Sequence, residues 1–159
     1  DKIRALDIDK FLEWSIPFLI KGQVISGTPE EINIVKSALP IIQERIVKLS
    51  EIPQMLNFLF VKNFSVDPEE LPKLLDDSSQ KVLSTALAKV ENLTDWTHQK
   101  IEEVLRIALI EDLGLKPRIA FSAIRIAVTG SHISPPLFES LELLGKERSI
   151  ARIKAVISK

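Results

Sequence analysis

Apolar residues in this chain recur at intervals of three and four, and proline or glycine interrupts the pattern before any segment becomes long. Such spacing places apolar side chains on one face of a helix. The clearest helix start is Thr28, Pro29 and Glu31, which fit the N-cap, the first helical position and the glutamate of a capping box. Strand patterns are almost absent, because the one short candidate, 124–128, has no comparable partner. The sequence therefore predicts an all-α fold.

Capping residues and prolines set the expected helix boundaries. Asp7 or Asp9 caps a first helix through Ile20, which Pro17 bends or ends early. Pro40 is expected to end the helix that begins at Pro29, because the residue before a proline is pushed out of helical space. The other expected helices cover 41–49, 52–60 with Ser50 as cap, Ser78 or Ser79 to Val90, Thr94 to Gly114, 119–128, 137–144 and the residues after Gly145.

The polar segment from Asn92 to Asp95 is the expected hinge between two helical subdomains, 1–92 and 93–159. The length of 159 residues suits one medium domain or two small ones. The chain begins at Asp1 without a methionine, which suggests a fragment, although a processed terminus would look the same. No apolar run reaches the roughly eighteen residues that a spanning helix needs. We therefore expect a cytoplasmic protein with no membrane partner.

The composition argues against catalysis by this chain. Hydrophobic residues make up 45% and charged residues 27%, which is typical of a globular protein rather than a disordered one. With no cysteine or tyrosine and only two histidines, His98 and His132, the sequence contains no thiolate nucleophile, zinc motif or obvious triad. No glycine-rich phosphate loop is present either. We expect no cofactor or metal in this chain.

The stretch from Arg125 to Leu144 is the strongest candidate for a binding site. An apolar segment stops at Gly130, a polar turn follows, and a Pro-Pro pair opens a second apolar segment, so the pattern predicts a corner between two helices. Potential hydrogen-bonding residues on the corner are Arg125, Thr129, Ser131, His132 and Ser134. A turn of this kind can hold unstacked bases of single-stranded RNA, and Arg125 can donate two hydrogen bonds to one base.

Charge is distributed unevenly along the chain. From Leu113 onward there are eight basic and three acidic residues, whereas the remainder has 13 basic and 19 acidic ones. A basic end on an acidic body is typical of a surface that faces phosphate, but a solvated helix face has the same composition. The phosphate-contact candidates are Lys146, Arg148, Arg152 and Lys154, of which the last three are expected to be exposed.

The segment RIAVTGSHISPPLFESLELLGKERSIARI resembles the C-terminal motif of bacterial glutamyl-tRNA synthetases, R-x-A-x-T-G-x-x-x-[ST]-P-x-L-F-E-x-L-x-x-L-G-K-E-R. The resemblance extends over the whole chain as the anticodon-binding region, and it implies an α-helical cage of two subdomains. It also implies an N-terminal catalytic domain in the same parent protein, which uses ATP and magnesium for ligation.

The resemblance assigns roles to individual residues. Arg125, Ser134, Pro135 and Leu137 correspond to positions that hold anticodon bases. Counting back from Pro53, Arg45 corresponds to an arginine that binds the third anticodon base and helps to exclude glutamine tRNA. The sequence departs from the family at Ser134, where many members have threonine, and at Ile107, where a basic residue is expected and Arg106 is its neighbour.

The resemblance therefore implies that this fragment selects tRNA(Glu) through its anticodon loop for an enzyme whose catalytic domain lies elsewhere. We expect a monomer. Two alternatives remain open at this point. One is a helical protein-interaction module with a solvated basic face, and the other is a small enzyme that acts by itself.

Overall fold

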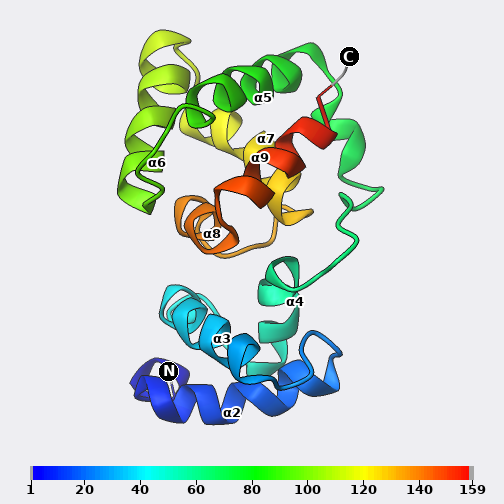
Figure 1. Ribbon diagram of the computed structural model, residues 1–159, viewed down its shortest axis with the longest axis vertical. Helices are drawn as coiled ribbons and strands as arrows, with labels where there is room; N and C mark the ends of the chain where they lie inside the picture. Colours follow the sequence, from blue (N-terminus) through cyan, green and yellow to red (C-terminus); the bar gives the residue numbers. More distant parts are fainter. Residues whose placement is uncertain (1, 158–159) are drawn as a thin grey trace. The chain divides into compact units, whose positions relative to one another are not determined.

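The structure is a computed structural model that describes residues 2–157, and the regular structure in this range is entirely helical. The expectation of an all-α fold is therefore confirmed. The helices form two compact units (Figure 1). Unit 1 contains the described residues up to Asn63 together with Ile133–Pro136. Unit 2 contains Phe64–His132 and the described residues from Leu137 onward.

Unit 1 is built on α2 (Ile8–Lys21), α3 (Pro29–Ile42) and α4 (Ile52–Leu56), and α1 (Lys2–Ala5) precedes them. Asp7 caps α2 by accepting a hydrogen bond from the Lys10 amide at 2.8 Å. Pro17 does not end α2, which continues to Lys21. The capping box at Thr28 and Glu31 is present, as predicted. Phe11, Leu19, Val35 and Leu39 are fully buried where α2 packs on α3.

Three helix predictions in unit 1 were wrong. Pro40 does not end α3, because Leu39 and Ile42 on either side of it are fully buried and packing holds the helix through the proline. The separate helix expected over 41–49 is absent, because α3 extends to Ile42 and the residues from there to η1 are not helical. The Glu51 carboxylate accepts hydrogen bonds from the amides of Val47 and Lys48, both at 2.7 Å, and this holds the segment in a turn. The expected helix over 52–60 is divided into η1 (Leu49–Glu51), α4 and η2 (Asn57–Leu59), with no side-chain cap from Ser50.

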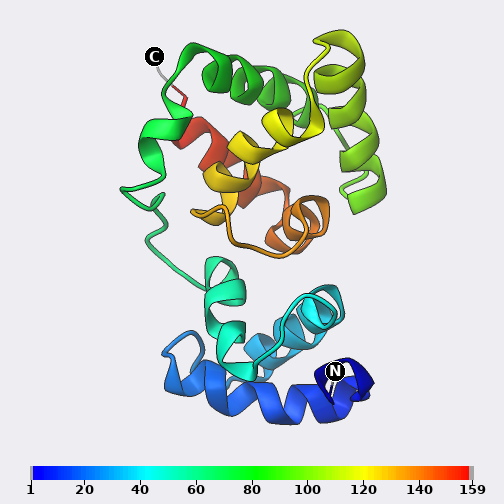
Figure 2. The ribbon, with the colours of Figure 1, turned by 180° about the vertical axis from the view of Figure 1, so that it is seen from behind.

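Unit 2 is organised around α7 (Pro117–Thr129), which packs against α5 (Asp77–Val90), α8 (Leu137–Leu144) and α9 (Lys146–Ala155). Figure 2 shows α7 from behind, running beneath α5. The remaining elements are η3 (Leu71–Leu74), α6 (His98–Leu105) and the π-helical segment η4 (Arg106–Asp112). Buried alanines and β-branched residues on three sides of α7 let its neighbours approach closely: Ala120, Ala123, Ile124, Ile126, Ala127 and Val128.

Several expectations for unit 2 are corrected by the structure. Asp76, not Ser78 or Ser79, caps α5, since its carboxylate accepts from the Ser79 amide at 2.7 Å. Thr97, not Thr94, caps α6. The two units divide at Asn63, whereas the sequence suggested a boundary between 92 and 93. The reason is that α5 packs on both α7 and α9 and is part of their core.

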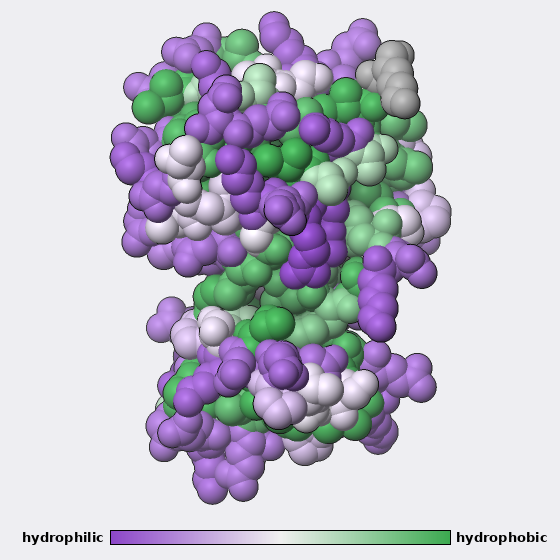
Figure 3. All heavy atoms as spheres, in the orientation of Figure 1, coloured by the Kyte–Doolittle hydropathy of each residue, from purple (hydrophilic) through white to green (hydrophobic). Residues whose placement is uncertain are grey.

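The surface mixes hydrophilic and apolar side chains over both units on the face shown in Figure 3. None of the helices in the described range has the length and apolar character needed to cross a membrane.

Candidate nucleic-acid interface

The predicted corner lies between α7 and α8. Helix α7 ends at Gly130, which adopts the left-handed conformation at φ 87° and donates its amide hydrogen to the Ile126 carbonyl at 2.8 Å. The Thr129 hydroxyl lies within hydrogen-bond distance of the carbonyl oxygens of Arg125 (2.7 Å) and Ser131 (2.8 Å). Thr129 therefore stabilises the turn from within, while the half-buried Arg125 extends from the last two turns of α7.

A buried carboxylate supports the corner. Glu70 is 7% exposed, and its Oε1 accepts from Lys73 Nζ at 3.1 Å and lies 3.2 Å from His132 Nδ1 on the corner. Its Oε2 is buried and has no hydrogen-bond partner in the described part of the chain. Burial raises the pKa of Glu70, but the hydrogen bonds and charges of Lys73 and His132 outweigh it and hold the pKa below its ordinary value. The Asp67 amide also donates to the Gly130 carbonyl at 3.2 Å.

The sequence analysis did not identify Glu70 as part of the corner. Glu70 and His132 are 62 positions apart in the sequence. No local pattern connects them, so only the packing of the 67–74 segment against α7 shows the pair.

The other corner residues fall in both units. Ser134 and Pro135 lie in the segment that belongs to unit 1, and both are buried. Ser134 Oγ donates to the Pro135 carbonyl at 2.9 Å. Leu137 begins α8 in unit 2 and is 3% exposed. Arg45 is exposed in the turn that follows α3 in unit 1, where its amide donates to the Ile42 carbonyl at 2.9 Å.

Arg152 is not exposed, contrary to the expectation from sequence. It is 6% exposed, donates from Nη1 to the Val128 carbonyl at 2.6 Å, and places its guanidinium 3.8 Å from the centre of the Phe64 ring. Burial, with a smaller contribution from the Arg148 charge, lowers the pKa of Arg152 to about 10. Arg152 therefore ties α9 to the end of α7 inside unit 2.

The other basic residues of α9 are partly neutralised. Lys146 Nζ donates to the Leu93 carbonyl at 2.7 Å, and Lys154 pairs with Glu91 at 3.6 Å. Both lysines line a hollow of about 570 Å³ that Glu91 and Glu147 also line, so two cations face two anions there. Arg148 is exposed, and its Nε donates to the Leu144 carbonyl at 3.1 Å.

Arg106, the neighbour of the expected basic position, is engaged within unit 2. Its Nε donates to Glu102 at 2.7 Å, and its guanidinium lies over the Phe121 ring at 5.3 Å and the Phe138 ring at 6.0 Å. These contacts orient Arg106 toward α7 and α8. Ile107 itself is 46% exposed.

In the part of the chain that the structure describes, no group of three or more histidines, aspartates or glutamates could hold a metal ion.

Comparison with known proteins places the chain in a family. Glutamate–tRNA ligase of Saccharopolyspora erythraea is 42% identical over 156 residues, which are 96% of this chain and 31% of that protein. The corresponding ligase of Kocuria rhizophila is 44% identical over 157 residues, or 97% of this chain and 31% of that protein. The chain thus spans about a third of the length of the curated relatives that it matches.

A crystal structure of a glutamate tRNA ligase from Elizabethkingia meningosepticum has the same fold, with a TM-score of 0.75 over 98% of this chain and 30% of that one, at 19% sequence identity. The sequence model of the anticodon binding domain matches residues 10–157. This match covers nearly the whole chain, both units included. The chain therefore belongs to the anticodon binding domain family.

Proposed function

We propose that this chain is the anticodon-binding part of a glutamate–tRNA ligase and that it binds the anticodon loop of tRNA(Glu). The observation that carries the proposal is the family match over residues 10–157, together with 42–44% identity to glutamate–tRNA ligases over almost the whole chain. The ligation reaction, with its ATP and magnesium, belongs to a catalytic domain elsewhere in the parent protein. The anticodon-binding part contributes affinity and the choice of tRNA.

The corner supplies the base-binding groups in this proposal. Arg125 donates hydrogen bonds to a base edge. Ser134, Pro135 and Leu137 are buried, so their proposed part is to set the shape of the turn rather than to touch a base. Two features of unit 2 support this assignment. The left-handed conformation of Gly130 defines the turn, and the contact of Glu70 with His132 holds the residues that follow it in place. A pre-formed turn loses little conformational freedom on binding. Arg45 is proposed to bind the third anticodon base.

The proposed phosphate contacts on α9 are reduced to Arg148, Lys146 and Lys154, because Arg152 is buried. The same finding weakens the alternative of a protein-interaction module, whose main support was a solvated basic face.

The parent protein is proposed to be cytoplasmic and monomeric.

The proposal is tested by measuring the affinity of the chain for anticodon stem-loops. Arg125→Ala should weaken binding of the cognate loop by about 1–3 kcal/mol and should have a much smaller effect on a loop with a scrambled anticodon. Lys154→Ala should weaken both loops equally, because a phosphate contact carries no sequence information. Circular dichroism of each variant must match that of the unchanged chain. Equal losses for both loops in the Arg125 variant would refute its base-binding role.

A further inference from the structure

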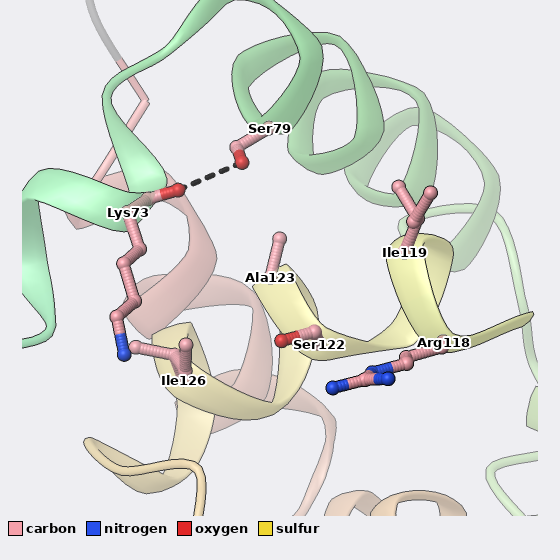
Figure 4. A pocket seen from close by; sticks show the side chains of 7 residues that line it. All are labelled: Lys73, Ser79, Arg118, Ile119, Ser122, Ala123 and Ile126. Atoms are coloured by element: carbon pink, nitrogen blue, oxygen red, sulfur yellow. Dashed lines mark hydrogen bonds between the residues drawn. The ribbon is translucent and has the colours of Figure 1, made fainter.

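A second basic site lies on unit 2, on the exposed side of α7. A hollow of about 250 Å³ is formed where the first turns of α7 meet η3 and the start of α5. Lys73 and Arg118 place positive charge at its rim, Ser122 offers a hydroxyl between them, and Ile119 and Ile126 supply apolar walls (Figure 4). No carboxylate lines it.

The hollow and the corner are joined along one side of α7. Ser122 follows Arg118 by four residues, and Arg125 follows Ser122 by three, so the three side chains lie along one helix face. Arg118 and Arg125 are the only charged residues of α7. Two helical turns separate them, or about 10 Å along the axis. This face therefore presents two positive charges with a hydroxyl between them, and α7 itself carries no negative charge.

Two polar groups of the hollow are available to a ligand, whereas the Ser79 hydroxyl donates to the Lys73 carbonyl at 2.8 Å. Arg118 and Ser122 are exposed, and neither forms a hydrogen bond or ion pair with any described residue. The side chain of Lys73 is 58% exposed while it pairs with Glu70. The basic residues of α9 differ, because Arg152 is buried and Lys154 is paired. Arg118 thus adds an exposed cation on α7 to the basic residues that sequence reasoning placed on α9.

The size and chemistry of the hollow limit what it can hold. Its volume is below the roughly 300–1,000 Å³ of small-molecule sites, so it suits one group of a larger ligand. A guanidinium binds phosphate oxygens through two parallel hydrogen bonds, and serine hydroxyls and lysine ammonium groups are common additional donors. The apolar walls suit the sugar beside a phosphate. A carboxylate of an acidic protein segment would meet the same donors, and the experiment below separates the two.

We propose that Arg118 and Ser122, with Lys73, bind a backbone phosphate of the same RNA whose bases contact Arg125. Helix α7 then follows the RNA strand, with base contact at its C-terminal end and phosphate contact at its N-terminal end. This inference rests on the proposed function, because the ligand at both ends is one RNA molecule.

The test compares Arg118→Ala and Arg118→Lys with the unchanged chain, using cognate and scrambled anticodon stem-loops over a range of salt concentrations. Lys73 is not substituted, because its loss would also disturb the buried Glu70. Lys89→Ala is the control, since Lys89 is an exposed lysine on α5 that does not line the hollow. Arg118→Ala should weaken both loops by the same factor and reduce the slope of log K against log salt by about 0.7–0.9. Arg118→Lys should restore most of the slope, and Lys89→Ala should leave it unchanged.

Several results would overturn the inference. If the unchanged chain binds the loops and Arg118→Ala alters neither affinity nor salt slope, the phosphate site is absent while the proposed function stands. A loss confined to the cognate loop would make Arg118 a base contact instead. Binding of poly-glutamate that competes with RNA and is lost in Arg118→Ala would make the hollow a site for acidic protein segments. If the unchanged chain shows no salt-sensitive RNA binding, the proposed function fails as well.

Discussion

Removal of Arg152 should destabilise unit 2 without removing an RNA contact. Its charged hydrogen bond to the Val128 carbonyl, at 2.6 Å, is worth about 1.5–3 kcal/mol, and its stacking on Phe64 adds up to about 2 kcal/mol at a desolvated site. Part of this gain is offset by the cost of burying the charge, which is visible in the lowered pKa of about 10. We therefore expect Arg152→Ala to lower the free energy of unfolding of unit 2 by about 2–4 kcal/mol.

The assay is urea unfolding followed by the fluorescence of Trp96, whose indole donates to the Leu141 carbonyl inside unit 2. A Trp14→Phe background removes the only other tryptophan, which lies in unit 1. Arg148→Ala is the matched control on the same helix, and we expect it to change stability by less than about 1 kcal/mol because Arg148 is exposed. If Arg152→Ala unfolds at the same urea concentration as the unchanged chain but binds RNA with a smaller salt slope, Arg152 is a phosphate contact and the structural argument is wrong.

Three further substitutions test the supports of the two units by chemical unfolding. Thr28→Ala should lower the free energy of unfolding of unit 1 by about 1 kcal/mol, because it removes one half of the capping box, whereas Thr28→Ser should leave it nearly unchanged. Equal stability of the two variants would contradict the role of the cap. Gly130→Ala should lower the free energy of unfolding of unit 2 by about 1–2 kcal/mol, because φ is 87° and an added Cβ would lie 3.3 Å from the Phe64 ring. Unchanged stability would refute the left-handed turn. Glu70→Gln should destabilise unit 2 at pH 7. The lowered pKa of Glu70 means that the carboxylate stabilises the fold above its ordinary pKa of 4.5 and loses this effect as the pH falls through the lowered value. The difference from the unchanged chain should therefore shrink in acid, and a constant difference from pH 7 to 3 would exclude a role for the charge.

Features governed by neighbouring residues could be predicted from the sequence. The capping box at Thr28, the helix end at Gly130 and helix α8 all appear where the pattern placed them. Each depends on backbone hydrogen bonds within a few residues, and so the relevant residue types lie together in the sequence.

Features governed by packing could not be predicted in this way. Pro40 lies inside a helix because buried residues on both sides hold it there. Arg152 looked like a surface cation because its partners, Phe64 and the Val128 carbonyl, come from distant segments. The contact between Glu70 and His132 was not predicted, because these two residues also come from distant segments. Periodicity assigns a face to each side chain, but it does not show which element covers that face.

The most direct test of the central claim is a binding titration of the unchanged chain with the anticodon stem-loop of tRNA(Glu) and with the same stem-loop carrying a scrambled anticodon, each at two salt concentrations. The account predicts tighter binding of the cognate loop at both concentrations, and a loss of affinity for both loops as salt rises. Equal affinity for the two loops, or no salt-sensitive binding of either, would contradict it.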